Sequence, residues 1–281
     1  MNLTQEELSK IDRLIDFAFE EDIAQGDITT ESIFPEVTEA TAILTAKASG
    51  VVSGIEIVQR VLDKRGPNHI QYFAHDGDFV QKGDQIIAIT ASYSTLLTAE
   101  RLLLNIMQRM SGIATETRRY VEACKGTHTH ILDTRKTAPG LRLLDKMAVR
   151  HGGGHNHRMG LYDMVMLKDN HIKAVGCITE AVRMVRSQLP LSIKVEVETT
   201  TLEEVDEAVR AGADIIMLDN MDNVAMREAI VRINHRCSTE ASGNMSLERI
   251  AEVAALGVDY ISVGALTHSV KALDISMNFV K

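Results

Sequence analysis

From about residue 128 onward, the sequence alternates short apolar runs with longer amphipathic runs, and this alternation constrains the fold more than any other feature. The apolar runs predict strands at 130–133, 163–168, 192–198, 214–218, 237–241 and 259–263. The amphipathic runs predict helices at 141–150, 178–188, 202–211, 222–235 and 246–256. Alternation at this pace indicates parallel β/α units. Because a regular barrel has eight strands and six are recognisable, we expect irregular closure.

Two short segments, AGAD at 211–214 and LGVD at 256–259, repeat one pattern. Each predicts the end of a helix, a glycine turn and the start of a buried strand, which is the recurring joint of an α/β barrel. The first part of the chain differs. There we predict helices at 5–21, 53–65 and 94–110 and strands at 40–48 and 85–90, with the boundary between the two parts at 105–125.

Composition and charge limit the class of protein. The 281 residues are 45% hydrophobic and 25% charged, which is typical of a globular chain long enough for one large or two modest domains. The three cysteines lie far apart without a CxxC pair, which favours a reducing compartment. The acidic, amphipathic N-terminus is not a signal peptide, and no apolar run reaches membrane-spanning length. We therefore expect a cytoplasmic protein that binds neither membranes nor, at a net charge of −9, nucleic acid.

A basic stretch, residues 133–173, stands out in this acidic chain. It holds eight Lys and Arg side chains against four Asp. A helix with a charged outer face would explain the charge alone. The spacing favours a site, because DTRKT at 133–137 and KDNH at 168–171 each follow a predicted strand. Polar residues at the carboxyl ends of strands are where α/β proteins place their sites, so the predicted ligand is strongly anionic.

The other predicted strands also end in polar residues. Lys194, Glu196 and Glu198 alternate along one strand, so all three are expected on one face, where buried charge is costly unless it lines a site. Glu198 and Asp219 offer hard oxygen ligands that suit Mg²⁺. The loops after the last two strands are candidate phosphate cradles, since small residues let backbone N–H groups approach an anion. These loops contain Ser242, Gly243 and Asn244, and Ser262, Val263 and Gly264.

Three histidines, His151, His155 and His157, lie within seven residues. No cysteine or carboxylate stands at ligand spacing beside them, and glycines separate them, so a zinc site is not expected. A histidine next to Arg158 is better suited to binding an anion. The sequence contains no G-x-S-x-G elbow and no context for a cysteine nucleophile.

Taken together, these motifs closely resemble the quinolinate phosphoribosyltransferase family, also called nicotinate-nucleotide pyrophosphorylase (carboxylating). The resemblance covers nearly the whole chain. Besides the stretches above, it includes Glu100-Arg101, Leu218-Asp219-Asn220 and, near the N-terminus, Glu21-Asp22 followed by Gly26-Asp27 and Thr29-Thr30. One departure is Asn244, where many members have a second glycine. Asparagine tolerates the unusual backbone angles that such a loop demands.

The resemblance implies a fold of two parts. These are an N-terminal α/β sandwich at 1–112, joined by the C-terminal tail 268–281, and a seven-stranded, irregular, TIM-like α/β barrel at 113–267 that holds the active site. It implies an enzyme of de novo NAD biosynthesis, a homodimer or higher oligomer with shared active sites. The family transfers phosphoribosyl from phosphoribosyl pyrophosphate to quinolinate, with Mg²⁺, and releases nicotinate mononucleotide, pyrophosphate and CO₂.

Carried over residue by residue, the resemblance also implies roles. Arg135, Arg158 and Lys168, with His157 beside them, would hold the carboxylates of quinolinate. Arg101 would enter from the neighbouring subunit. Thr134, Lys136, Glu198 and Asp219 would serve the ribosyl pyrophosphate and its metal, with Lys136, Glu198 and Asp219 catalytic. The loops at 242–244 and 262–264 would bind the ribose 5-phosphate.

Two other classes fit part of the pattern. A related protein of molybdenum-transport operons shares the barrel and the arginine motifs, but in that group the lysine of KDNH is typically replaced, whereas Lys168 is present here. A non-catalytic phosphosugar sensor could use the two phosphate loops, but it has no use for Glu198 and Asp219 beside Arg135 and Lys168. Both features favour the quinolinate enzyme.

Overall fold

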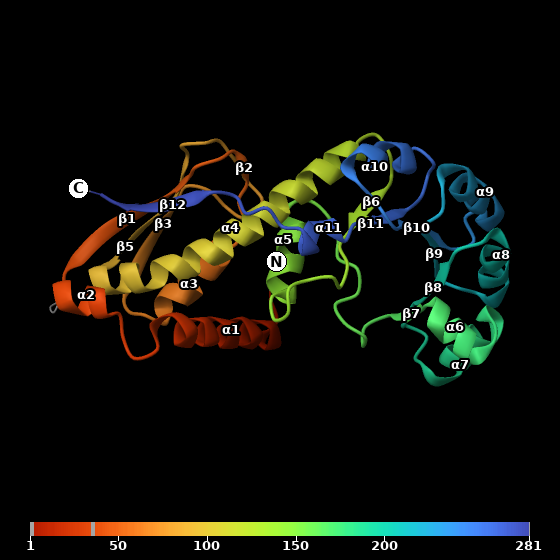
Figure 1. The fold of residues 1–281 in the computed structure, drawn as a ribbon, viewed down its shortest axis with the longest axis horizontal. Helices are drawn as coiled ribbons and strands as arrows, with labels where there is room; N and C mark the ends of the chain where they lie inside the picture. Colours follow the sequence, from red (N-terminus) through yellow and green to blue (C-terminus); the bar gives the residue numbers. More distant parts are fainter. Residues whose placement is uncertain (1–2, 35–36, 281) are drawn as a thin grey trace. The chain divides into compact units, whose positions relative to one another are not determined.

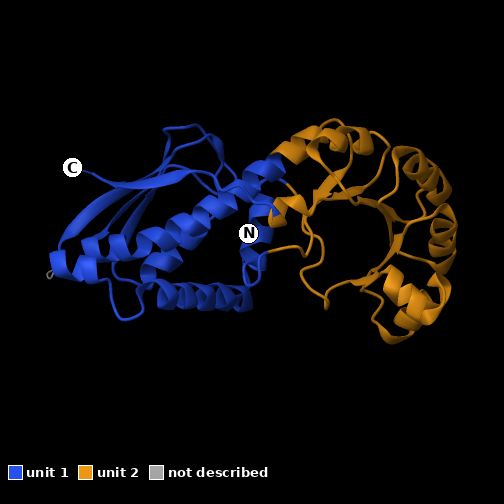
Figure 2. Ribbon diagram, in the orientation of Figure 1, with its two compact units in different colours: residues 1–118, 138–153, 269–281 blue, residues 119–137, 154–268 orange. Residues whose placement is uncertain are grey.

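The computed structural model describes residues 3–34 and 37–280, which divide into two compact units, residues 1–118, 138–153 and 269–281 and residues 119–137 and 154–268 (Figure 2). The helices are α1 (Gln5–Ile23), α2 (Ile28–Ile33), α3 (Ile55–Asp63), α4 (Tyr93–Ala123), α5 (Arg142–His151), α6 (Asp169–Val175), α7 (Ile178–Gln188), α8 (Leu202–Ala211), α9 (Asn223–Ile233), α10 (Leu247–Ala254) and α11 (Ala265–His268). The strands are β1 (Glu39–Ala46), β2 (Gly50–Val51), β3 (Asn68–Tyr72), β4 (Phe79–Val80), β5 (Gln85–Ser92), β6 (His130–Leu132), β7 (Val165–Leu167), β8 (Val195–Thr199), β9 (Ile215–Asp219), β10 (Ser238–Ser242), β11 (Tyr260–Ser262) and β12 (Ile275–Phe279).

The first unit is built on an antiparallel sheet with the strand order β12-β1-β5-β3 (Figure 1). Alternate residues of β1 and β5 are buried, and the register places Leu44 opposite Ile87 and Ala42 opposite Ile89. Helix α1 begins at a capping box, in which Thr4 accepts the N–H of Glu7 and Glu7 accepts the N–H of Thr4. This sheet belongs to the N-terminal domain that the resemblance implies.

The second unit is built on a parallel sheet with the strand order β6-β11-β10-β9-β8-β7. Helices α7 to α10 lie outside this sheet, so the unit forms a curved β/α array (Figures 1 and 2). Both predicted joints are confirmed, because Gly212 and Gly257 adopt positive φ between a helix and the following strand. The predicted parallel α/β architecture is therefore confirmed.

The number of barrel strands differs from the expected seven. Within the described residues, the parallel sheet has six strands, and His155 adds a single isolated parallel bridge to Leu132 beside β6. Its N–H donates to the carbonyl of Ile131, and its carbonyl accepts the N–H of Asp133. The glycine-rich loop around this residue pairs at one position only, so it adds a bridge and not a strand.

Two elements depart from their predicted extent. Helix α4 continues well beyond residue 110, because its later buried face carries small and hydroxyl residues such as Ala114 and Thr117, which do not register as an apolar pattern. Residues 138–153, placed in the barrel range 113–267 above, belong to the first unit. There Asp145 accepts two hydrogen bonds of 2.8 Å from Arg109, and a side chain at Gly152 would meet the carbonyl oxygen of Ala114 at 2.5 Å. The ends of the predicted domains, residues 1–2 and 281, lie outside the described residues.

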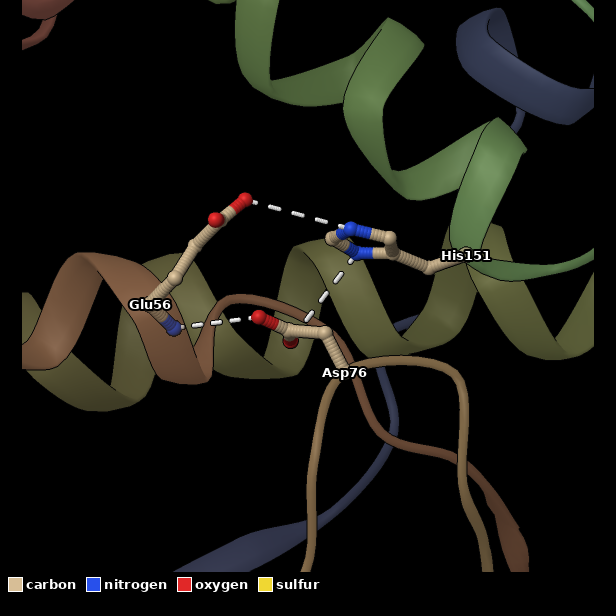
Figure 3. A group of neighbouring side chains, drawn as sticks. All are labelled: Glu56, Asp76 and His151. Atoms are coloured by element: carbon tan, nitrogen blue, oxygen red, sulfur yellow. Dashed lines mark hydrogen bonds and ion pairs between the residues drawn. The ribbon is translucent and has the colours of Figure 1, made fainter. Parts of the chain in front are cut away.

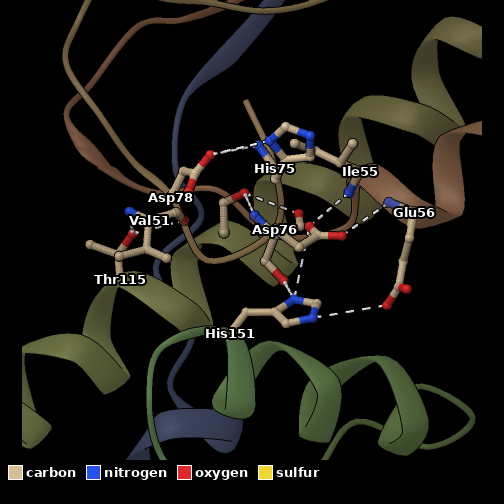
Figure 4. Close-up of polar contacts among 10 residues, drawn as sticks. Val51, Ile55, Glu56, His75, Asp76, Asp78, Thr115 and His151 are labelled. Carbon is tan, nitrogen blue, oxygen red and sulfur yellow. Dashed lines mark hydrogen bonds and ion pairs between the residues drawn. The ribbon is translucent and has the colours of Figure 1, made fainter. Parts of the chain in front are cut away.

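Helix α3 takes its N-terminal cap from a distant turn. Its own N-cap, Gly54, has no capping side chain. The carboxylate of Asp76 accepts the N–H of Ile55 at 2.9 Å and that of Glu56 at 3.0 Å, and Figure 3 shows the second of these bonds. The imidazole of His151 lies beside this carboxylate, with Nδ1 3.8 Å from Asp76 and Nε2 3.9 Å from Glu56. Figure 4 shows these contacts together with neighbouring residues of the same turn, among them His75 and Asp78.

Among helices within 3–34 and 37–280, none has the length and apolar character to span a bilayer.

The Asp76 cap leads to a first prediction. Asp76→Ala leaves two helix N–H groups without their acceptor, so we expect the free energy of unfolding to fall by about 1–2 kcal/mol. Urea denaturation followed by circular dichroism measures this change. Asp84→Ala is the matched control, because the side chain of exposed Asp84 accepts the N–H of Gln81 in a surface turn and caps no helix. Equal stability losses in the two variants would contradict the role of Asp76.

Candidate active site

The second unit contains a cavity of about 980 Å³ at the carboxyl ends of its strands. The loops after β6 and β7, the end of β8 and the loops after β9, β10 and β11 all contribute to its wall. The predicted site residues in the wall are Thr134, Arg135, Lys136, His157, Arg158, Lys168, Glu198, Asp219, Ser242, Gly243, Asn244, Ser262 and Gly264. The structure thus brings together residues that are more than one hundred positions apart in the sequence.

Two predicted site residues lie elsewhere. Val263 is buried, and its N–H donates to the carbonyl of Leu132, so it belongs to the sheet and not to the cavity wall. Arg101 lies on α4 in the first unit with an exposed side chain, and it does not line the cavity. The basic stretch is divided as well, because Arg142, Lys146 and Arg150 lie on α5 in the first unit.

One part of the wall is cationic. The guanidinium of Arg158 donates to the carbonyl of Met164 at 3.0 Å, and Met166 Sδ lies 3.7 Å from its Nη2. Burial, together with the positive charge of Arg135, lowers the pKa of Arg158. Two guanidinium groups close enough to repel one another form a site for an anion with more than one negative charge.

A pair of carboxylates lies beside this cationic wall. Glu198 and Asp219 lie near the ends of the neighbouring strands β8 and β9, and Lys168 Nζ is 3.5 Å from Glu198. The side-chain amide of Asn220 donates to Asp219 at 2.8 Å. Because both carboxylates line the cavity and Mg²⁺ prefers oxygen ligands, this donor set fits Mg²⁺ with further oxygens from a bound phosphate.

The loop after β10 adopts the backbone that a phosphate cradle requires. Gly243 and Asn244 have φ of +92° and +50°, which confirms that an asparagine adopts an unusual angle here. A side chain at Gly243 would meet Asn220 Oδ1 at 2.2 Å. Arg249 donates to the carbonyls of Gly243 and Met221 and holds the loop from behind. The loop therefore needs glycine at position 243, and Arg249 fixes its backbone from two carbonyls.

The loop after β11 brings two basic side chains together. A side chain at Gly264 would meet Lys136 Cδ at 3.1 Å and His268 Cδ2 at 3.2 Å, so both pack over this glycine. Thr267 donates to the carbonyl of Lys136 at 2.9 Å. His268 lines the cavity but was not predicted, because it follows the glycine turn by four residues and belongs to no pattern in the sequence.

A buried ionisable group lies beneath the cavity. His157 Nε2 is 3.0 Å from Glu196 and 3.4 Å from Glu240, and both glutamates are fully buried. Burial and the charge of Glu240 raise the pKa of Glu196 to about 7. His157 Nδ1 accepts the N–H of Arg158 at 2.8 Å, which leaves the ring proton on Nε2, between the carboxylates.

Glu240 was missed in the sequence, and the available signal was a charged residue inside a strand expected to be buried on both faces. The prediction for the neighbouring strand was partly wrong. Lys194 precedes β8 and is exposed, whereas Glu196 is buried and Glu198 lines the cavity. The ionisable face therefore comprises only the two glutamates.

The three closely spaced histidines lie in three different environments. His151 Nδ1 lies 2.7 Å from Ser53 Oγ, the ring of His155 packs edge-on against His130 at 4.5 Å, and His157 contacts the two buried glutamates. Within the described part of the chain, two groups hold three potential ligand atoms within 4.8 Å of one another. These groups are Glu56, Asp76 and His151, and His157, Glu196 and Glu240.

An anion-binding cavity at the carboxyl ends of parallel strands is typical of α/β enzymes that act on phosphorylated substrates. The sequence matches two family models, "Quinolinate phosphoribosyl transferase, N-terminal domain" over residues 27–111 and "Quinolinate phosphoribosyl transferase, C-terminal domain" over residues 113–278. Together they span most of the chain. The chain belongs to the quinolinate phosphoribosyltransferase family.

Individual relatives agree with this family. The chain is 44% identical, over 96% of its length and 93% of the relative, to the probable nicotinate-nucleotide pyrophosphorylase (carboxylating) of Bacillus subtilis. It is 45% identical to the chloroplastic nicotinate-nucleotide pyrophosphorylase (carboxylating) of Arabidopsis thaliana, over 94% of this chain and 81% of that protein. The crystal structure of NadC from Streptococcus pyogenes superimposes with a TM-score of 0.94 at 41% identity, over 100% of both chains.

Proposed function

We propose that this chain is an enzyme that transfers the phosphoribosyl group of phosphoribosyl pyrophosphate to quinolinate. Its products are nicotinate mononucleotide, pyrophosphate and CO₂, in NAD biosynthesis. The curated relatives carry names for this activity. The observation that carries the proposal is one cavity with three kinds of groups, namely paired cations, paired carboxylates and glycine-containing loops. The paired cations suit a dicarboxylate, the paired carboxylates suit a metal-bound pyrophosphate, and the glycine-containing loops suit a sugar phosphate.

The cationic wall suits quinolinate. Arg135 and Arg158 would each bind a carboxylate through paired donors, and Lys168 would add a point charge. Burial and the charge of Arg135 together lower the pKa of Arg158, and a dianion between the two guanidinium groups would relieve their repulsion. His157, fixed behind Arg158, would shape the end of this pocket.

The remaining wall suits phosphoribosyl pyrophosphate. Lys136 and Thr134 would hold the pyrophosphate, and the loops at 242–244 and 262–264 would hold the 5-phosphate. Glu198 and Asp219 would hold Mg²⁺, which neutralises charge on the leaving pyrophosphate when it is bound. Their carboxylates would also stabilise the positive charge that develops on the anomeric carbon.

The chemistry needs little beyond alignment. The ring nitrogen of quinolinate carries a lone pair, so it can attack the anomeric carbon without a general base while the bond to pyrophosphate breaks. Holding the two reactants in line supplies much of the rate. The positively charged ring then accepts the electron pair of the breaking carbon–carboxylate bond, CO₂ leaves, and the ring carbon takes up a proton.

The family resemblance gives Arg101 a place in this scheme from a neighbouring subunit. Its side chain is exposed on α4 and does not line the cavity. We therefore propose a homodimer or a higher homo-oligomer in which Arg101 completes the quinolinate pocket of a neighbouring subunit. The cytoplasmic location stays a prediction.

A direct assay tests the proposed function. Purified protein is incubated with quinolinate, phosphoribosyl pyrophosphate and Mg²⁺, and nicotinate mononucleotide is followed by mass spectrometry. We expect product that disappears when nicotinate replaces quinolinate, because the carboxylate that leaves is then missing. Absence of product with all three components, while phosphoribosyl pyrophosphate still binds, would contradict the proposed activity.

The cationic wall leads to a second prediction. Lys168→Ala removes a cation from the quinolinate pocket, so we expect the Kd for quinolinate to rise about 10- to 100-fold, corresponding to one charged hydrogen bond. The Kd for phosphoribosyl pyrophosphate should change by less than about threefold, since the phosphate loops are untouched. Isothermal titration calorimetry measures both. Lys173→Ala is the control, because Lys173 lies on α6 outside the cavity and pairs with Asp169. Equal losses for both substrates would refute the role.

A further inference from the structure

Three buried ionisable side chains lie together at the cavity, whose lining includes His157 and Glu240, and the scheme above does not explain the burial of the two glutamates. Glu196 and Glu240 have no exposed surface, and the side chain of His157 is 7% exposed. Removing charged groups from water is costly, and an apolar trio of similar size would often be no less stable. Stability alone therefore does not explain why charged side chains occupy these buried positions, which points to a functional role.

The three side chains come from separate elements and converge on one atom. Glu196 lies on β8 and Glu240 on β10, the strands on either side of β9. His157 lies in the loop before β7, and its N–H donates to the buried carboxylate of Asp133 at 2.9 Å. The two glutamates therefore meet His157 Nε2 from neighbouring parts of the sheet while Asp133 holds its backbone.

The imidazole connects the glutamates to a cation of the cavity wall. Its Nε2 faces Glu196 and Glu240, and its Nδ1 accepts the N–H of Arg158. The ring can hold Arg158 in this way only while its proton stays on Nε2, because a proton on Nδ1 would face the N–H of Arg158. The carboxylates of Glu196 and Glu240, 3.0 and 3.4 Å from Nε2, attract a proton on that nitrogen and thus favour this tautomer and this orientation of the ring.

We propose that Glu196 and Glu240 are positioning residues that act through His157 to place Arg158 for the carboxylates of the substrate. This inference rests on the proposed function, because it assigns Arg158 to a dicarboxylate. In this proposal the glutamates act through His157 and not as ligands of the substrate. They set the backbone from which the Arg158 guanidinium reaches the cavity, and that guanidinium is held a second time by the carbonyl of Met164.

Three possible roles of Glu240 differ in their effect on quinolinate affinity. If Glu240 acted only through its negative charge, its removal would make the cavity more positive and would tighten the binding of a dianion. If it were purely structural, stability would change without a selective change in affinity. If it positions Arg158 through its 3.4 Å contact with His157, loss of the carboxylate oxygen weakens quinolinate binding alone.

Two substitutions at Glu240 separate these roles. Glu240→Leu removes both the charge and the acceptor, and we expect the Kd for quinolinate to rise about tenfold while that for phosphoribosyl pyrophosphate stays within about twofold. Glu240→Gln removes the charge but keeps an acceptor oxygen, so most of the wild-type affinity should return. Isothermal titration calorimetry on the full-length protein gives both constants. Similar effects of Leu and Gln, or tighter binding in either, would overturn the proposal.

A double-mutant cycle tests whether the effect passes through His157. In a His157→Asn background, Glu240→Leu should cause no further loss of quinolinate affinity, whereas independent effects would multiply. If Glu240→Leu does not fold, Glu196→Leu and Glu196→Gln give the same comparison. Thr239→Val is the control for buried changes in β10, because Thr239 is buried and bonds to Asp259 outside the cavity wall. Loss of quinolinate affinity in that control would also overturn the proposal. A wild-type protein that fails to bind quinolinate would instead refute the proposed function.

Discussion

Asp219→Asn is expected to lower kcat by about two to three orders of magnitude, the usual cost of removing one preorganised charge from a transition state. Asparagine keeps the size of the side chain, so the end of β9 should not change. The variant loses a negative charge beside the developing positive charge of the ribosyl group and one of the two proposed Mg²⁺ ligands. The concentration of Mg²⁺ that gives half-maximal rate should therefore rise as well.

Steady-state kinetics at several Mg²⁺ concentrations test this expectation. Asp222→Asn is the matched control, three residues further along the chain. Asp222 caps α9 by accepting the N–H of Ala225 at 2.8 Å and does not line the cavity. It should lose some stability and keep its kcat. If Asp219→Asn retained near-normal turnover and an unchanged Mg²⁺ dependence, Asp219 would have no catalytic or metal-binding role.

Arg101→Ala is expected to abolish activity almost completely, although Arg101 does not line the cavity of its own second unit. The proposed reason is that Arg101 reaches quinolinate in the neighbouring subunit. Removing one arginine from a charged, desolvated contact typically lowers kcat/KM by about two to three orders of magnitude. Lys136→Ala should be similarly inactive, because Lys136 lines the cavity and would hold the leaving pyrophosphate.

Mixing these two inactive variants separates action within a chain from action between chains. A heterodimer would contain one site with both residues intact, Lys136 from one chain and Arg101 from the other. Random exchange between dimers should therefore restore about a quarter of wild-type activity. Arg101→Ala mixed with the Asp219→Asn variant is a second such pair and should behave alike. If no activity returned after verified subunit exchange, the shared-site proposal would be wrong.

Much of the fold was predictable because the patterns that specify it are local. The predicted strands from β6 to β11 and the helices between them are all present, with ends that differ by a few residues. The carboxyl-end position of Arg135, Lys168 and Asp219 could be read directly, since each follows or ends a recognisable strand. Asn244 adopts a positive φ, which asparagine tolerates, so the departure from glycine at this position is accommodated.

Other features depended on contacts between distant segments. Residues 138–153 look like one more barrel helix, yet Asp145 and Gly152 place them against α4 of the first unit. The seventh barrel strand is reduced to one bridge at His155. No local sequence pattern predicts either feature, because each depends on contacts with residues that are distant in the sequence.

The sequence alone therefore determined the β/α order, the strand ends that carry polar groups and the anionic character of the ligand, because periodicity and charge are properties of short segments. Only the tertiary structure decided which of these groups share a cavity, and that Arg101 and Val263 are not among them. It also joined His157 to Glu196 and Glu240, residues about forty and eighty positions away in the chain. A hydrogen bond needs atoms within about 3 Å of one another, and packing alone sets that distance.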